Sequence, residues 1–130
     1  MERCPMLAVD VIIRTPDGLV LIKRKNEPYK GRWAIPGGFV RYGERVEDAA
    51  AREVKEETSL RVKLGKLVGV YSDPKRDPRG HVVSVCFLAE RAGGRLKASS
   101  DAQDIKIFKH IPWRELAFDH ARILKDAGFK

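Results

Sequence analysis

Apolar residues recur along the chain in short runs that have the length of β-strands. Residues 7–14, LAVDVIIR, and residues 18–25, GLVLIKRK, are rich in aliphatic side chains and flank the turn sequence TPD. This arrangement predicts a β-hairpin. Residues 61–72 and 81–90 are also strand-like and flank a loop, DPKRDPRG, so they predict a second hairpin. The alternating segment 104–110 predicts one further strand.

Helical segments are predicted between these strands. Residues 46–58 contain three consecutive alanines and no Gly or Pro, which favours a helix, and a second helix is expected after Pro112, beginning again near Asp119. Residues 26–44 hold two prolines and four glycines, so they predict a loop with a short extended piece near Trp33 and Ile35. A turn is predicted at residues 92–94, AGG.

The order of these elements predicts an α/β protein with helices packed on a mixed sheet. The 130 residues are enough for one hydrophobic core of ordinary size, and no linker, repeat or low-complexity segment divides them. We therefore expect a single domain over residues 1–130.

Charge and cysteine content restrict the partners and the compartment. The formal net charge of +8 favours an anionic partner, but the basic residues are scattered, which argues against nucleic acid as the main target and suits a small phosphorylated ligand equally well. Cys4 and Cys86 stand far apart without metal-site spacing, which is typical of reduced thiols in the cytoplasm. No apolar run approaches the roughly 20 residues that cross a bilayer, so no membrane association is expected.

Three glutamates lie close together on the predicted helix. Glu53, Glu56 and Glu57 are spaced i, i+3 and i+4, so they share one helical face and repel each other. Two interpretations are open: a solvated acidic face, and a divalent-cation site made of oxygen ligands. The glycine-containing loop before the helix, GGFVRYGE, favours the cation site because its backbone carbonyls could join the carboxylates.

The stretch from residue 38 to residue 60 resembles the Nudix box, whose pattern is G-x5-E-x7-R-E-U-x-E-E-x-G-U with U a bulky aliphatic residue. Eight of its nine specified positions are matched, by Gly38, Glu44, Arg52, Glu53, Val54, Glu56, Glu57 and Leu60. The ninth differs, because Ser59 stands where the family has glycine. Serine can adopt the left-handed conformation expected there at a cost of about 1 kcal/mol. The segments WAIPGGFV and AFDHARIL are also similar to the family, so the resemblance covers nearly the whole chain.

The resemblance implies an α/β/α sandwich around a mixed sheet and hydrolysis of a nucleoside diphosphate linked to another group, with Mg²⁺ or Mn²⁺ as cofactor. Arg52 is expected to hold glutamates in position. Glu44 is also consistent with a carboxylate that stabilises the helix start. Glu53 is the implied base; Asp101 and Asp104 are alternatives that a polar loop would contain in any case. The implied metal ligands are Glu56, Glu57, Glu53, Glu44 and the carbonyl oxygens of Gly37 and Gly38.

The implied substrate is ADP-ribose or a similar nucleoside diphosphate sugar. Pro74 lies 15 positions after Ser59, a spacing that resembles ADP-ribose pyrophosphatases, although a proline is also ordinary in such a loop. Arg76 and Arg79 in that loop, and Lys23 and Arg24 at the end of the second strand, are candidates to contact the substrate or are solvated surface charges. Trp33, Tyr29 and Tyr71 are candidates to stack on a base or are core residues. His120 is assigned to capping and packing.

Alternative functions remain open at this point. A nucleoside triphosphate pyrophosphatase and a diadenosine polyphosphate hydrolase are the alternatives among enzymes, and a nucleotide-sensing domain is the non-enzymatic one. The intact box glutamates and the chain length argue against the sensor. The family resemblance also leaves a homodimer open.

Overall fold

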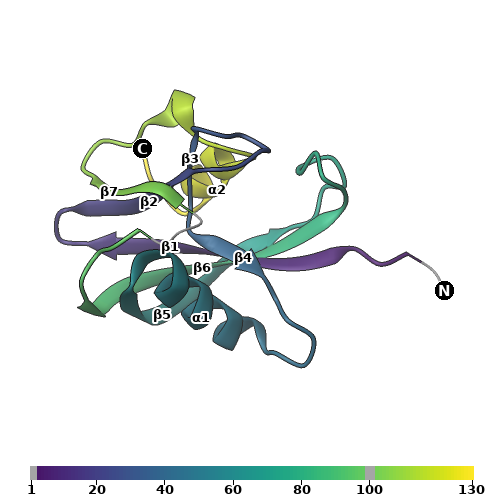
Figure 1. The fold of residues 1–130 in the computed structure, drawn as a ribbon, viewed down its shortest axis with the longest axis horizontal. Coiled ribbons are helices and arrows are strands. Elements are labelled where there is room, and N and C mark those ends of the chain that lie inside the picture. Colours follow the sequence, from purple (N-terminus) through teal and green to yellow (C-terminus); the bar gives the residue numbers. More distant parts are fainter. Residues whose placement is uncertain (1–2, 99–101) are drawn as a thin grey trace.

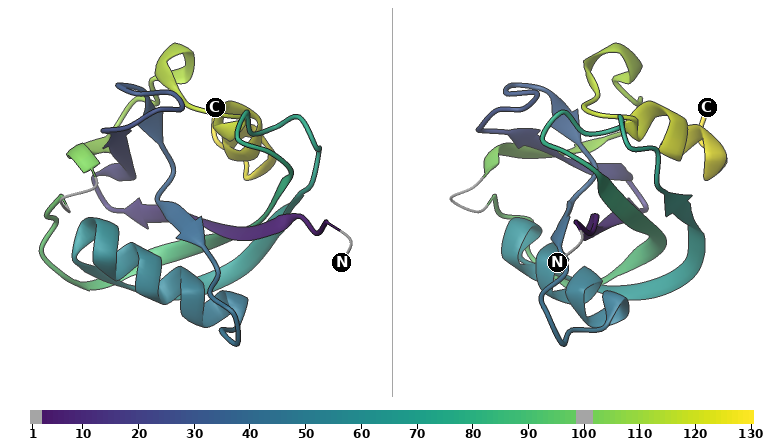
Figure 2. Two further views of the ribbon diagram at one scale, coloured as in Figure 1. Left: turned by 45° about the vertical axis from the view of Figure 1, so that its right-hand side comes forward. Right: turned by 90° about the vertical axis from the view of Figure 1, so that its right-hand side faces the viewer.

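The computed structural model describes residues 3–98 and 102–130 and shows a mixed sheet between two helices (Figure 1). Helix α1 lies on one side of the sheet and helix α2 on the other (Figure 2). The strands are β1 (Met6–Thr15), β2 (Gly18–Arg24), β3 (Trp33–Ala34), β4 (Gly37–Phe39), β5 (Leu60–Tyr71), β6 (Val82–Gly94) and β7 (Ala102–Phe108). The helices are α1 (Val46–Thr58), a 3-10 turn η1 (Trp113–Glu115) and α2 (His120–Asp126). The predicted fold class is confirmed.

Strand β1 is the centre of the sheet. It pairs in parallel with β6 and antiparallel with β2 and β4, while β3 and β7 pair with β2, and β5 pairs with β6. Both predicted hairpins, β1–β2 and β5–β6, are therefore confirmed. The predicted turn at residues 92–94 is wrong, because β6 continues to Gly94. There Gly93 and Gly94 pair with Arg61 and Leu60 of β5, and this pairing outweighs the local turn preference of the glycines.

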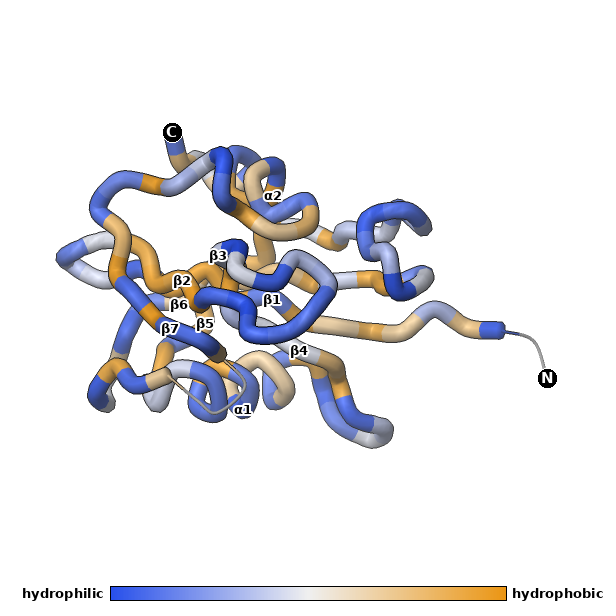
Figure 3. Tube along the Cα trace, turned by 45° about the horizontal axis from the view of Figure 1, so that its top comes forward, coloured by the Kyte–Doolittle hydropathy of each residue, from blue (hydrophilic) through white to orange (hydrophobic). Residues whose placement is uncertain are grey.

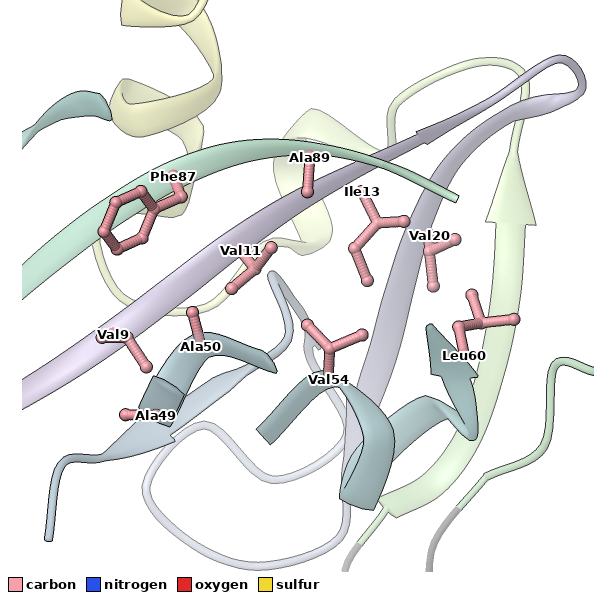
Figure 4. Packing of buried hydrophobic residues seen from close by; sticks show 10 residues of the cluster. All are labelled: Val9, Val11, Ile13, Val20, Ala49, Ala50, Val54, Leu60, Phe87 and Ala89. Carbon is pink, nitrogen blue, oxygen red and sulfur yellow. The ribbon is translucent and has the colours of Figure 1, made fainter. Parts of the chain in front are cut away.

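Alternation along β1 produces two separate cores. Val9, Val11 and Ile13 point to the α1 side and pack against Ala50 and Val54 (Figure 4). Ile12 points to the other side and packs with residues of α2. Hydrophobic positions accordingly concentrate on the central strands, and hydrophilic ones on the loops (Figure 3). Asp10 shares the α2 side with Ile12, so an acidic side chain is held at the sheet face opposite the α1 core.

Helix α1 has the predicted boundaries and is capped at its C-terminal end by Ser59. Ser59 has φ 63° and ψ 11°, which is the left-handed conformation, and its N–H donates to the Lys55 carbonyl. Thr58, which is buried, donates its hydroxyl to the Val54 carbonyl and accepts from the Leu60 N–H. The chain thus turns directly from α1 into β5. No helix of the described residues is long and apolar enough to cross a membrane.

Replacing Ser59 with glycine is expected to raise the free energy of unfolding by about 1 kcal/mol, because glycine adopts the left-handed conformation without the Cβ penalty. The Ser59 side chain is exposed, so little packing is lost. Urea unfolding of Ser59→Gly, with Ser59→Ala as the matched control, measures the effect. A gain of equal size in Ser59→Ala would show that relief of backbone strain is not the cause.

Candidate active site

Arg52 connects the carboxylates of Glu44, Glu53 and Glu56. Its Nε and Nη2 donate to both oxygens of Glu44 at 2.8 and 2.9 Å. Its Nη1 donates to Glu53 at 2.7 Å and to Glu56 at 3.3 Å, and Nη2 also donates to the Phe39 carbonyl at 3.0 Å. One guanidinium therefore orients three glutamates and ties α1 to the end of β4.

Glu44 is occupied by this contact. Hydrogen bonds from Arg52 and from the Arg41 backbone lower the pKa of Glu44 to about 2, and the same pairing raises the pKa of Arg52. Glu44 does not line the pocket described below. The structure therefore shows Glu44 as the partner of Arg52, whose Nη1 contacts Glu53 and Glu56, and leaves Glu44 outside the pocket lining.

Glu53 lies directly against the backbone of Gly38. A Cβ atom built on Gly38 would lie 2.4 Å from the Glu53 carboxylate, so the carboxylate can occupy this position only beside a glycine. Burial raises the pKa of Glu53, although Arg52 opposes this shift. The predicted pair of Gly38 backbone and Glu53 carboxylate is therefore brought into contact by the approach of α1 to β4.

Glu57 is the most strongly perturbed carboxyl group of the site. Its Oε1 accepts from the Gly37 N–H at 3.1 Å. Burial, with the negative charges of Glu53 and Asp10, raises the pKa of Glu57 to about 8. Buried carboxylates that repel each other in this way are stabilised by a bound cation.

The donor set suits a hard divalent cation. Carboxylate oxygens of Glu53 and Glu57 lie beside the backbone of Gly37 and Gly38, and Glu56, whose side chain is 51% exposed, completes the same helical face. Within residues 3–98 and 102–130, no three acidic, histidine or cysteine side chains already converge at ligand distance. The half-exposed Glu56 contacts Arg52 and Arg41, and it would have to turn from these arginines to serve as a ligand.

A pocket of about 370 Å³ opens beside these glutamates. Glu53, Glu56, Glu57 and Gly38 line it together with Arg24 and Arg79. Further lining residues are Asp10 of β1, Phe118 from the segment before α2, and His120, the first residue of α2. Residues from distant parts of the sequence thus meet around one cavity.

Two arginines in the pocket lie close enough to repel each other. Burial and the positive charge of Arg79 lower the pKa of Arg24, whose Nε donates to the Pro28 carbonyl at 2.6 Å. Arg79 is held by a double hydrogen bond to the buried Asp77. Both guanidiniums lie over the Phe118 ring, at 5.0 and 5.7 Å from its centroid. Such a pair of cations beside an aromatic ring favours an anion in the pocket.

Arg76 lines the pocket but is already paired. Its side chain is 6% exposed and donates to both oxygens of Asp119, at 2.9 and 2.8 Å, and its Nη2 lies 4.0 Å from Asp10. Burial lowers the pKa of Arg76, and the Asp119 contact outweighs this and raises it. Arg76 therefore neutralises Asp119 and lies near the buried Asp10. Arg79 is also paired, with Asp77, but its side chain is 45% exposed and that of Arg76 only 6%.

The remaining predicted residues lie elsewhere. Trp33 packs edge-on against Phe108, with ring centroids 4.7 Å apart, and does not line the pocket. Tyr29 packs against Phe118, and the Tyr71 hydroxyl donates to Asp126. Asp104 is part of β7, and Asp101 lies outside the described residues.

Sequence reasoning missed Asp10, Phe118 and the position of His120. His120 is buried, and its Nδ1 accepts from the Ile35 N–H at 3.0 Å, so it joins α2 to the segment between β3 and β4. Burial lowers the pKa of His120, which keeps the ring neutral. A signal existed for Asp10, which is the one acidic residue within the apolar run of residues 7–14.

The chain is similar to known proteins in both sequence and structure. The NUDIX domain model matches residues 5–127. The chain is 53% identical over 122 residues to the ADP-ribose pyrophosphatase of Methanocaldococcus jannaschii, covering 94% of this chain and 72% of that protein. A MutT/nudix family protein from Enterococcus faecalis has a similar structure, with a TM-score of 0.85, 31% identity, and coverage of 98% of this chain and 62% of that one.

A bifunctional NMN adenylyltransferase/ADP ribose pyrophosphatase from Francisella tularensis, in complex with AMP and a manganese ion, is also similar. Its TM-score is 0.84 at 25% identity, over 95% of this chain and 41% of that chain.

Proposed function

Because this chain belongs to the NUDIX family, we propose that it is a metal-dependent pyrophosphohydrolase that cleaves ADP-ribose to AMP and ribose 5-phosphate. The observation that carries the choice of substrate is the 53% identity, over 94% of the chain, to an archaeal ADP-ribose pyrophosphatase. The pocket chemistry agrees with this choice, because a dianionic diphosphate suits the two neighbouring guanidiniums of Arg24 and Arg79, which repel each other.

The proposed cofactor is Mg²⁺, with Mn²⁺ as a substitute, because oxygen ligands suit both ions. Glu53, Glu56, Glu57 and the backbone carbonyl of Gly38 would hold it. When bound, the ion would neutralise the diphosphate charge and acidify the attacking water. The family is typically dependent on divalent metal ions, and a structural relative contains manganese.

The protein's own groups would bind the diphosphate, offer an apolar surface and accept a proton. Arg24 and Arg79 would hold the diphosphate, and Phe118 would offer an apolar surface beside them. Water adds to one phosphorus, the bridging P–O bond breaks, and the leaving phosphate takes the bridging oxygen. Glu53 is the proposed acceptor of the water proton, because it lines the pocket and the Arg52 contact fixes its position beside Gly38.

Product analysis tests this proposal. Purified protein with Mg²⁺ is incubated with ADP-ribose, a panel of nucleoside triphosphates and diadenosine polyphosphates, and the products are identified by chromatography and mass spectrometry. AMP and ribose 5-phosphate from ADP-ribose, formed with the highest kcat/KM of the panel, are expected. Faster release of pyrophosphate from a triphosphate, or binding of ADP-ribose without turnover, would overturn the assignment.

A further inference from the structure

Asp10 and His120 form a polar pair in the pocket that the hydrolytic roles above do not use. Asp10 comes from the central strand β1 and is 9% exposed, and His120 is the first residue of α2 and is 3% exposed. Their facing atoms, Asp10 Oδ1 and His120 Nε2, are 3.8 Å apart. Both residues line the pocket, so the space near this gap is reached from the substrate side.

The other polar atoms of the two side chains are already committed. The Ser84 hydroxyl donates to Asp10 Oδ2, and Arg76 approaches that same oxygen. The Ile35 N–H donates to His120 Nδ1, so the neutral ring carries its proton on Nε2. Among residues 3–98 and 102–130, the structure gives neither Oδ1 of Asp10 nor Nε2 of His120 a hydrogen bond. The pair therefore presents one acceptor and one donor to the pocket.

A hydroxyl group satisfies both atoms at once, because it donates one hydrogen bond and accepts others. An oxygen about 2.8 Å from each atom bridges a 3.8 Å gap without any movement of the side chains. A phosphate oxygen would be repelled by Asp10. An ammonium group has no acceptor for the His120 N–H, so that donor would stay without a hydrogen bond. The donor–acceptor pair thus selects a neutral hydroxyl over either kind of ion.

The position of Asp10 indicates which part of a substrate carries that hydroxyl. A Cβ on Gly37 would lie 2.6 Å from Asp10 Oδ1, and the N–H of the same glycine donates to Glu57. The Asp10 carboxylate is therefore close to Glu57, one of the glutamates that would hold the metal. On a nucleoside diphosphate, the hydroxyl-bearing group nearest to the diphosphate is the sugar esterified to it, so a sugar is the group best placed to reach this point.

We propose that Asp10 Oδ1 and His120 Nε2 form a hydroxyl subsite that binds a ribose esterified directly to the diphosphate. The inference rests on the proposed function, since it assigns specificity residues to the same pocket. ADP-ribose contains two such riboses, one on the adenosine side and one at the far end, and the same hydroxyl chemistry could come from either.

Hydroxyl-deleted substrates test the subsite and identify the ribose. The kcat/KM of the wild-type protein is measured for ADP-ribose and for two analogues, one lacking the 2′ and 3′ hydroxyls of the adenosine ribose and one lacking those of the terminal ribose. One analogue is expected to react roughly 10- to 100-fold more slowly, which is the effect of losing a hydrogen bond to a charged group. Equal rates for all three substrates would overturn the inference while leaving the proposed function intact.

Two independent variants then locate the discrimination. Asp10→Asn keeps the side-chain shape, and His120→Asn keeps an acceptor near the Ile35 N–H but brings no donor to the position of Nε2. In both, the ratio between ADP-ribose and the discriminated analogue should fall to about 3 or less, with a higher KM for ADP-ribose and a smaller change in kcat. An unchanged ratio in these folded variants would refute the subsite.

Asp119→Asn is the matched control, because Asp119 and Asp10 both interact with Arg76 but Asp119 does not line the pocket. The wild-type ratio is expected to persist in this variant. An equal collapse of the ratio in Asp119→Asn would show that the ion-pair network, and not hydrogen bonding by Asp10, discriminates the substrates.

Discussion

Glu57→Gln is expected to lower kcat by roughly 10³-fold, because the loss of a ligand charge removes several kcal/mol of metal-assisted stabilisation of the transition state. The substitution keeps the size of the side chain and retains an acceptor for the Gly37 N–H. The fold should therefore persist, and activity alone should be lost. Steady-state kinetics with saturating Mg²⁺ and the best substrate measures the effect.

The pH dependence of the same variant separates metal binding from a structural role. The folded pKa of Glu57, about 8, lies above its ordinary value of 4.5, so the metal-free folded protein holds a proton that the unfolded chain releases. This contribution to stability is fully present below about pH 4.5 and is lost as the pH rises through about 8. The metal-free wild type should thus lose stability over this range, and Glu57→Gln should lose less.

Metal affinity should change with pH in the opposite direction. Because the ion must displace the proton of Glu57, the affinity should rise by up to about tenfold per pH unit below pH 8 and then level off. Calorimetric titration with Mg²⁺ or Mn²⁺ at several pH values measures this slope. Glu47→Gln is the matched control, since Glu47 is an exposed glutamate on the same helix. Full activity in Glu57→Gln, or equal loss in Glu47→Gln, would contradict the metal assignment.

The local parts of the fold were predictable from the sequence for physical reasons. The boundaries of α1 could be predicted because they depend on one short segment. The alanines give this segment a high helix propensity, and the left-handed conformation expected at Ser59 ends the helix. The shared face of Glu53, Glu56 and Glu57 follows from helical geometry alone. Hairpins were predictable for a similar reason, since a turn and its flanking runs lie close together in sequence.

The rest of the pocket depends on contacts between distant segments. Asp10 and His120 are 110 positions apart, and only the packing of α2 on the β1 face brings them together. Arg76 and Arg79 have the same chemistry, neighbouring positions and a place in the pocket lining, but Arg76 is buried against Asp119 and Arg79 is half-exposed beside Phe118. Trp33 shows the same limit, because its partner Phe108 lies on a strand that pairing with β2 places beside it. Residue type and spacing do not encode such tertiary neighbours.

Gly37 and Gly38 are adjacent in β4, yet alanine is expected to lower activity at Gly38 and stability at Gly37. A methyl group on Gly38 would meet the carboxylate of Glu53 at 2.4 Å, and that carboxylate is the end of a flexible side chain that can rotate away. Gly38→Ala should therefore fold but lose roughly 10²-fold in kcat, which is the effect of misplacing a reacting group by about 1 Å.

A methyl group on Gly37 would lie 2.1 Å from the Val9 carbonyl oxygen, which belongs to the backbone of β1. No side-chain rotation relieves that overlap, so β4 must separate from the central strand, and Gly37→Ala should cost about 3 kcal/mol or more of folding free energy. Thermal unfolding and kinetics of both variants measure the contrast. Gly69→Ala is the control, because its nearest neighbour lies at an ordinary contact distance of 3.5 Å. A Gly38→Ala protein with full kcat would show that the Glu53 carboxylate does not act from the position it occupies here.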